Sequence, residues 1–329
     1  MPDPSNPSPA WMAPDSPILV GVSSCLLGEP VRWDGAHKLN AYLQQELSNQ
    51  VRWVPVCPEV GIGLSIPRPP IQLVQAADRI RAMGVTDRSL DVTERLSAYG
   101  KSQVDALRDL SAYVFKSKSP SCGLERVKVH GPHGGRSLAT GVGVYASEWK
   151  AACPELPMED EERLRDVALR DNFLERLFAY RRWQAMVGAG FSPERLVLFH
   201  GFHKYALMAH GAAPAKRLGR IVAEAGTRTP SELQQEYFQA FMGLLKRKAT
   251  SKQHANVLQH LMGYLKRGIR STEKAELTGA IEAYRLEQVP RNVPLNLLRR
   301  QFQRHPHPYV AGQTYLYPEP AERRLRGLD

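Results

Sequence analysis

The stretch ILVGVSSC, residues 18–25, is a short apolar run that ends in two serines and a cysteine. Aliphatic and β-branched residues followed by turn-forming residues predict a buried strand and then a loop. The same pattern recurs as VRWVPVC at 51–57 and AYVFKSKSPSC at 112–122. Residues 39–49 and 90–110 have helical spacing between these runs. Strands that alternate with helices predict an α/β domain with a Rossmann-like, mostly parallel sheet.

The second half of the chain has a different pattern. Apolar residues recur there at helical spacing, which predicts helices at 164–186, 230–249, 251–269 and 271–288. We therefore expect a disordered lead-in at 1–15, an α/β domain at 16–155 and an all-α domain at 156–329. Within these limits, residues 126–146 are predicted to form a late hairpin, the acidic run near 158–162 to begin a helix, and the chain from Val289 onward to be a proline-rich tail.

Composition limits the class of protein. The chain has 329 residues, of which 43% are hydrophobic, and no apolar run approaches the ~20 residues that span a membrane. The polar, proline-rich N-terminus lacks the features of a secretory signal. Four cysteines in so long a chain do not indicate a disulfide scaffold. We expect a cytoplasmic protein without membrane contact, and its oligomeric state stays open.

Positive charge is concentrated in the second half. The net charge is +11, and residues 151–329 carry 28 Lys and Arg against 19 Asp and Glu. Residues 201–300 alone hold 17 against 7. A basic excess confined to one region favours a polyanionic partner. The alternative is a basic surface that is merely solvated.

The cysteines provide the first candidate site. Cys25, Cys57 and Cys122 each follow the carboxyl end of a predicted strand, and in an open parallel sheet these ends share the edge at which ligands bind. Three thiolates leave one coordination position open, as in catalytic metal sites. Thiolates suit zinc or an iron–sulfur cluster, which spacing alone does not separate. Ordinary buried cysteines are the alternative, and Cys153, with no strand before it, is interpreted as structural.

The residues around these cysteines resemble a known family. The blocks VSSCLLGEPVRWDGAHK (22–38), VPVCPEVGIGLSIPRPPIQL (54–73) and FKSKSPSCGLERVKV (115–129) are similar to those of the TudS family of thiouracil and 4-thiouridine desulfidases. LRDNFLERLFAYRRW (169–183) and YLYPEP (315–320) resemble the YbgA-like helical domain that is often fused to it. The two-domain arrangement is similar to that of bacterial desulfidases acting on 4-thiouridine in tRNA.

The resemblance implies a [4Fe-4S] cluster held by Cys25, Cys57 and Cys122, with one open iron for the substrate sulfur. It implies that Glu59 is an acid/base group, although an ion pair with a nearby arginine is the alternative for this side chain. It also implies a catalytic serine, and between Ser119 and Ser121 we prefer Ser119. Further candidates for holding substrate or phosphate are Ser24, Arg32, Lys38, Arg68, Lys116 and Lys118.

The expected function is removal of sulfur from 4-thiouridine in tRNA, with the helical domain as the RNA-binding part. Candidates for tRNA contact are Lys204, Lys216, Arg217, Arg220, Lys246, Arg247, Lys248, Lys252, Lys266, Arg267 and Arg270. Neither SGGxDS nor G-x-x-x-x-G-K-[ST] occurs, so no nucleotide cofactor is expected. The alternatives are a desulfidase of free thiouracil or thiolated nucleotides, and a non-catalytic RNA-binding protein with zinc.

Overall fold

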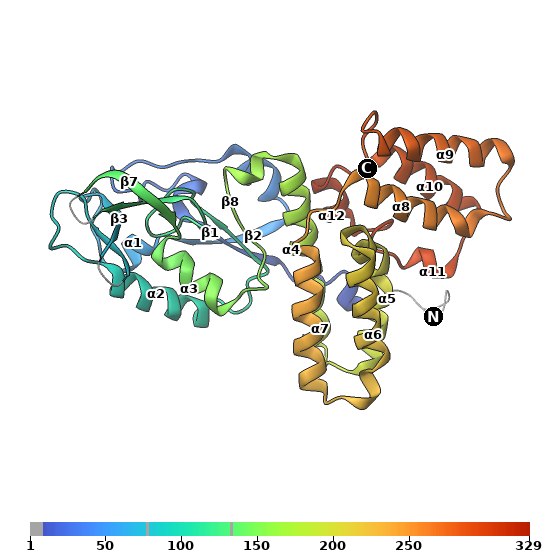
Figure 1. The fold of residues 1–329 in the computed structure, drawn as a ribbon, viewed down its shortest axis with the longest axis horizontal. Helices are drawn as coiled ribbons and strands as arrows, with labels where there is room; N and C mark the ends of the chain where they lie inside the picture. The colour runs from blue at the N-terminus through green and yellow to red at the C-terminus, as the bar shows by residue number, and fades with distance from the viewer. Residues whose placement is uncertain (1–8, 77–78, 132–133) are drawn as a thin grey trace. The chain divides into compact units, whose positions relative to one another are not determined.

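The computed structural model describes residues 9–76, 79–131 and 134–329, and the chain divides into two compact units (Figure 1). Residues 16–173 form the first unit, and residues 174–329 together with residues 9–15 belong to the second. The division falls within α4 (Val167–Gly188), later than the expected boundary at 155/156. The difference arises because β8 (Met158–Asp160), which follows that boundary, pairs with β5 (Ala112–Phe115) in the first unit.

A four-stranded parallel sheet forms one layer of the first unit. Its strands are β1 (Ile18–Ser23), β2 (Val51–Val56), β5 and β8, in the order β2-β1-β5-β8, and every pair in it is parallel. The prediction of an α/β domain with a mostly parallel sheet is confirmed. The carboxyl ends of β1, β2 and β5 therefore lie at one edge of the sheet.

A second, mixed sheet was not predicted. It has the order β4-β3-β6-β7 and is built from β3 (Ile71–Gln75), β4 (Ile80–Gly84), β6 (Val127–Gly131) and β7 (Gly134–Gly141). The antiparallel pair of β6 and β7 confirms part of the expected hairpin. The prediction was wrong from residue 144 on, because α3 (Val144–Ala152) begins there.

Aromatic packing fixes the centre of the parallel sheet. The rings of Tyr113 and Phe115 on β5 stack with centroids 3.9 Å apart, and the hydroxyls of Tyr113 and Tyr145 lie 3.2 Å apart. A Cβ at position 21 would lie 2.5 Å from the Tyr113 ring. Gly21 of β1 is therefore required because the ring occupies the space of a side chain.

Short helices complete the first unit. Helices α2 (Thr93–Ala106) and α3 lie side by side along the strands (Figure 1). The remaining helical segments are α1 (Pro58–Gly61), η2 (Ser24–Leu27), the π-helix η3 (Leu43–Leu47) and η4 (Arg163–Arg165).

The second unit is helical, as predicted. Beyond α4 its helices are α5 (Pro193–His210), α6 (Ala212–Ala223), α7 (Pro230–Leu245), α8 (Ser251–Met262), α9 (Ser271–Arg285), α10 (Asn292–Arg304), α11 (Pro308–Ala311) and α12 (Pro320–Leu325), with short turns η5 (Ala225–Thr227) and η6 (Gly263–Leu265). The expectation of a proline-rich tail from Val289 was wrong, because α10, α11 and α12 lie there. Their prolines fall in first turns, where the missing N–H costs nothing.

The lead-in also differs from expectation. Residues 1–8 lie outside the described residues, whereas η1 (Ala10–Met12) packs into the core of the helical unit. The Trp11 ring lies 6.0 Å from Phe199 and 6.1 Å from Phe202, centroid to centroid. Burial of Trp11 and Met12 makes the end of the lead-in part of the helical core.

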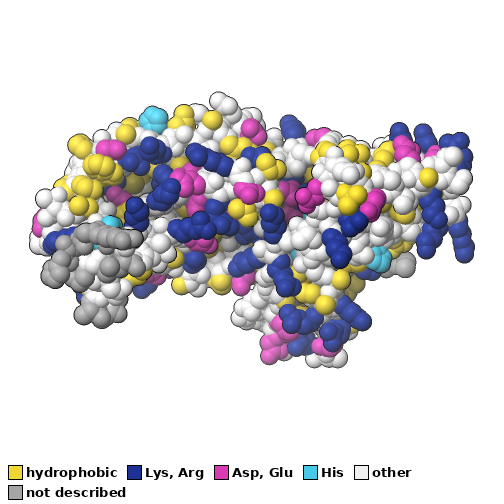
Figure 2. Space-filling view, turned by 45° about the horizontal axis from the view of Figure 1, so that its top comes forward, with side chains coloured by type: hydrophobic (Ala, Val, Ile, Leu, Met, Phe, Trp, Pro, Cys, Tyr) yellow, Lys and Arg dark blue, Asp and Glu magenta, His cyan; other side chains and the backbone are white. Residues whose placement is uncertain are grey.

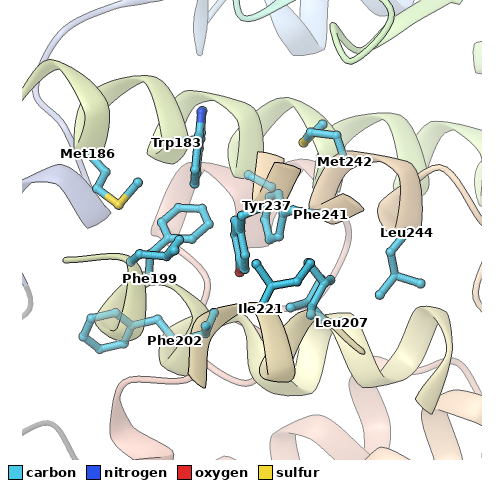
Figure 3. Close-up of a cluster of buried hydrophobic side chains, with 14 of the residues drawn as sticks. Trp183, Met186, Phe199, Phe202, Leu207, Ile221, Tyr237, Phe241, Met242 and Leu244 are labelled. Atoms are coloured by element: carbon cyan, nitrogen blue, oxygen red, sulfur yellow. The ribbon is translucent and has the colours of Figure 1, made fainter. Parts of the chain in front are cut away.

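This core is dense in aromatic side chains from α4, α5 and α7 (Figure 3). Trp183 of α4 stacks on Tyr237 of α7, with centroids 5.7 Å apart, and Phe199 of α5 meets Phe241 of α7 at 5.1 Å. Ile221 contributes from α6 (Figure 3). Aromatic burial of this kind contributes strongly to stability.

Acid is expected to destabilise the helical unit through His203. Its Nδ1 donates to the Phe199 carbonyl oxygen at 2.8 Å, and its buried Nε2 has no hydrogen-bond partner among the described residues. Burial, reinforced by Arg182, lowers the pKa of His203 to about 3. In the unfolded chain this histidine becomes protonated below about pH 6.5, whereas in the folded chain it stays neutral. The free energy of unfolding is therefore not reduced by this group above that pH, and it falls below it. From pH 7 to 5 we expect a loss of about 2 kcal/mol of unfolding free energy, measured by urea unfolding.

The matched control is an exposed histidine on α8. His203→Leu should remove the His203 part of this pH dependence and leave a similar part in place, because burial also lowers the pKa of His200 on the same helix to about 4. His260→Leu should leave the pH dependence unchanged, because the His260 side chain is exposed. Equal pH profiles for the two variants would contradict the assignment to His203. Hydrogen exchange of the α5 amides would localise the effect.

None of the helices in the described parts of the chain is both long enough and apolar enough to cross a membrane.

Candidate active site

A cavity of about 480 Å³ lies at the carboxyl edge of the parallel sheet, within the first unit. Cys25, Cys57 and Cys122 all line it, and Cys153 does not. The structure also brings every other predicted residue of this domain to the same cavity. Those residues are Glu59, Ser119, Ser121, Ser24, Arg32, Lys38, Arg68, Lys116 and Lys118.

The ends of the strands position the first two cysteines. Cys25 lies in η2 directly after β1, and its carbonyl oxygen accepts from the backbone N–H of Lys38 at 2.8 Å. Cys57 follows β2 and is the residue before α1, where Pro58 occupies the first helical position. The Sγ of Cys57 lies 3.7 Å from the Val31 carbonyl oxygen.

The loop that carries Cys122 is fixed by the start of α3. The N–H groups of Val144 and Ala146 donate to the carbonyl oxygens of Pro120 and Ser121, at 3.0 and 3.1 Å. These are N–H groups that a helix end leaves without partners inside the helix. A Cβ at Gly143 would lie 2.5 Å from the Ser121 carbonyl oxygen, so the close approach requires glycine. The loop is therefore held in place by backbone contacts.

The three thiols lie in a common, poorly hydrated environment. Burial raises the pKa of Cys25 to about 11, and burial is also the main cause that raises the pKa of Cys57 and Cys122. The neighbouring thiols add to this for Cys25 and Cys122. Within the described ranges, no three His, Cys, Asp or Glu side chains are grouped closely enough to hold one metal ion.

Glu59 is oriented by two donors in the cavity. The Nε of Arg68 donates to its Oε2 at 2.8 Å, and the Ser121 hydroxyl donates to its Oε1 at 2.7 Å. The Arg68 and Glu59 side chains are only 3% and 12% exposed. The ion pair considered from the sequence is present, and the serine contact accompanies it.

The directions of their hydrogen bonds give Ser119 and Ser121 different roles. Because the hydroxyl hydrogen of Ser121 is used on Glu59, the 2.9 Å contact between the Ser119 and Ser121 oxygens has Ser119 as donor. Ser119 also accepts from the Cys122 N–H at 3.1 Å. Ser119 thus supports the cysteine loop, and Ser121 is the serine that contacts the carboxylate.

Most cations at the cavity are paired with carboxylates. Arg32 pairs with Asp34 at 3.2 Å, and Lys118 pairs with Glu162 at 2.8 Å. Lys116 pairs with Glu161. Of the lining cations, Lys38 alone has no carboxylate partner in the part of the chain that the structure describes. Its exposed ammonium is therefore available to an anion.

Some residues at or near the cavity were not predicted from the sequence. The acidic run predicted to begin a helix instead forms β8, and Glu161 directly after it accepts at 2.7 Å from the N–H of Ser117, which lines the cavity. The Ser23 hydroxyl accepts from the Lys116 N–H at 2.9 Å. Trp33 lines the cavity and is 44% exposed. The sequence feature that could have indicated Glu161 is the run of consecutive acidic residues after residue 158.

All of the cations listed as tRNA candidates are exposed on the helical unit. Arg270 pairs with Glu273 at 3.3 Å. Figure 2 shows Lys and Arg side chains over much of this unit, with a dense group at the right-hand end of the view. These Lys and Arg side chains are therefore accessible to the phosphate groups of a nucleic acid.

Comparison with known proteins agrees with the two-unit architecture. Residues 20–161 match the family model described as 2-thiouracil desulfurase, and a relative, the uncharacterized protein YbbK of Bacillus subtilis (strain 168), is 32% identical over 154 residues. That match covers 44% of this chain and 97% of YbbK. The chain belongs to the 2-thiouracil desulfurase family. The resemblance predicted from the cysteine blocks is confirmed.

The helical unit of this desulfurase-family chain also has a match. Residues 204–320 match the family of unknown function DUF1722. The uncharacterized protein YbgA of Escherichia coli (strain K12) is 29% identical over 161 residues, which is 48% of this chain and 95% of YbgA. Among solved structures, the [4Fe-4S]-dependent thiouracil desulfidase TudS is 28% identical, with a TM-score of 0.37, covering 47% of this chain and 97% of TudS.

Proposed function

We propose that the protein is a [4Fe-4S]-dependent desulfidase that converts 4-thiouridine in tRNA to uridine and releases sulfide. The observation that carries the proposal is the convergence of Cys25, Cys57 and Cys122 on one cavity beside the Glu59–Ser121 pair. Membership of the 2-thiouracil desulfurase family supports sulfur removal from a pyrimidine.

The three thiols at the cavity are suitable ligands for an iron–sulfur cluster. Three soft thiols, from three separate strand ends, line a cavity that no fourth cysteine reaches. A cluster held by three protein thiolates supplies an iron that can bind the substrate sulfur and make it a better leaving group.

Residues of the chain then transfer the protons of the reaction and orient the group that transfers them. Exchange of sulfur for oxygen takes the oxygen from water, breaks the C–S bond and moves both water protons to the departing sulfide, so no reductant is needed. Glu59 is placed to take a proton from the water and return it to the leaving group. Ser121 and Arg68 hold both carboxylate oxygens, which fixes the direction in which the carboxylate acts.

The distribution of positive charge on the protein supports a polynucleotide as the substrate. The exposed cations of the helical unit suit the phosphate backbone, and Lys38 at the cavity provides a further unpaired cation. A thiolated base within folded tRNA has to leave its stack to enter a cavity of this kind.

The test compares two substrates under anaerobic conditions. We expect the reconstituted protein to have at least ~10²-fold higher kcat/KM on bulk tRNA containing 4-thiouridine than on free 4-thiouridine, because phosphate contacts add affinity. The loss of 4-thiouridine absorbance and the release of sulfide are followed together. Equal kcat/KM values would contradict the assignment of tRNA as substrate.

A second candidate is desulfidation of free thiouracil, which the description of the matching family favours. Turnover of free thiouracil without turnover of tRNA would select it. A preparation that binds RNA and zinc but contains no iron or acid-labile sulfide would instead select the non-catalytic alternative.

A further inference from the structure

A groove of about 680 Å³ lies between α5 and α6 of the helical unit. Small residues make the space for it, because a Cβ at Gly201 would meet nothing within 4 Å and one at Gly219 would first meet His200 at 3.6 Å. On α6 the lining residues recur at helical spacing, so one face of that helix forms a wall. They are Ala212, Ala215, Lys216, Gly219, Arg220, Val222 and Ala223.

The interior of the groove is apolar. Val197, Met208 and Val222 line it, and Val197 is 51% exposed although it is a large aliphatic side chain. The ring of Tyr309, from α11, also lines the groove. Apolar surface that stays open to solvent indicates a binding site more often than a defect in packing.

The charged residues that line the groove are all cations. Lys204, Lys216 and Arg220 are exposed, and no Asp or Glu lines the groove. None of the three forms an ion pair with a carboxylate within the described ranges. Lys216 and Arg220 are one helical turn apart, so both can reach one anionic group. The Lys204 ammonium lies 5.6 Å from the centroid of the Tyr309 ring.

His200 adds a hydrogen-bonding group between the two helices. Its Nδ1 lies 3.1 Å from the hydroxyl of buried Tyr237, and its Nε2 is the atom nearest to a Cβ at Gly219, on the groove wall. Burial, reinforced by Lys204, lowers the pKa of His200 to about 4, so the ring is neutral near pH 7. A neutral imidazole can donate to or accept from the edge of a base.

We propose that this groove binds an unpaired nucleotide of the RNA substrate, with the base against the apolar walls and a phosphate on Lys216 and Arg220. An apolar lining with one aromatic ring, a neutral polar group and three cations match the parts of a nucleotide. An acidic peptide would use the cations but would bring no flat ring to the apolar lining. The inference rests on the proposed function, in which the helical unit takes RNA.

The test fills the groove without removing a charge. Gly201→Leu places a side chain into open space and replaces a glycine within a helix, so the fold should be retained. We expect the Kd for a labelled, unmodified tRNA transcript to rise about tenfold, the cost of one stacked base. Gly243→Leu is the matched control, because Gly243 is exposed on α7, has nothing within 4 Å of a Cβ and lies outside the groove.

The outcomes separate this proposal from the proposed function. A wild-type Kd for folded Gly201→Leu would overturn the groove assignment while leaving tRNA as substrate. Failure of the wild-type protein to bind the transcript would overturn both. If Gly201→Leu does not fold, uridine 5′-monophosphate is titrated against the wild-type protein with the Met208 methyl signal as probe. A shift that Arg220→Ala weakens supports the groove, and no shift overturns it.

Discussion

Replacement of Cys25, Cys57 or Cys122 by alanine, one at a time, is expected to abolish desulfidation of tRNA and to lower the iron bound per chain. Each thiol comes from a different strand end, so no neighbouring thiol can substitute for it. The loss of activity should exceed the ~10–100-fold effect of removing an outer partner of a metal ligand. Iron, acid-labile sulfide and visible absorbance are measured with activity after anaerobic reconstitution.

Cys153→Ala is the matched control. Cys153 follows α3 and does not line the cavity, so its replacement should leave iron content and turnover unchanged. Retention of a full cluster by any of the three ligand variants would contradict the assignment of that thiol. Loss of the cluster in Cys153→Ala would require a ligand set different from the one proposed.

Glu59→Gln is expected to lower kcat by about 10²–10⁴-fold with little change in KM or iron content. The amide has nearly the size of the carboxylate, but it cannot take up a proton from water. Ser121 and Arg68 donate to different oxygens of Glu59, and the amide replaces one of these oxygens by an NH2 group, so one of the two donors loses its acceptor.

Arg68→Lys distinguishes catalysis by Glu59 from a structural ion pair. This change keeps the positive charge next to the carboxylate and loses part of the guanidinium contacts, including the 2.9 Å bond to the Val31 carbonyl oxygen. It should cost roughly tenfold in kcat or less, because it acts only through orientation of Glu59. Equal losses in Glu59→Gln and Arg68→Lys would indicate that the pair is structural.

The sequence predicted the parallel sheet because each of its first three strands is a compact apolar run. It did not predict β8, whose residues Met158–Asp160 have low strand propensity. Pairing with β5 and the contact of Glu161 with Lys116 hold that segment in place, and both contacts are distant in sequence. The mixed sheet was missed for the same reason, since β3 pairs in parallel with the distant β6.

The missed helices have a different cause. Helix α5 packs on two sides, with Phe199 and Phe202 in one core and Tyr205 and Ala209 in the other. A helix that is apolar around most of its circumference has no clear amphipathic period. Helix α10 has a proline in its first turn, which made that region look like a tail.

The cysteine positions were accessible from sequence because strand ends of a parallel sheet converge on one edge. The relation between Ser119, Ser121 and Glu59 was not, because it depends on hydrogen-bond direction between loops that are 62 residues apart. Lys116 was a candidate, but its partner Glu161 follows the neighbouring strand β8 and is 45 residues away in the sequence. Side-chain pairing between distant loops requires the structure.

The central claim is a desulfidation that depends on the cluster and uses water. The most direct measurement is the ratio of sulfide released to uridine formed, with purified 4-thiouridine tRNA and anaerobically reconstituted protein, without added reductant or ATP. The account predicts one sulfide for each uridine, and no reaction by the protein before reconstitution. Dependence on ATP or a reductant, or full turnover without iron, would contradict it.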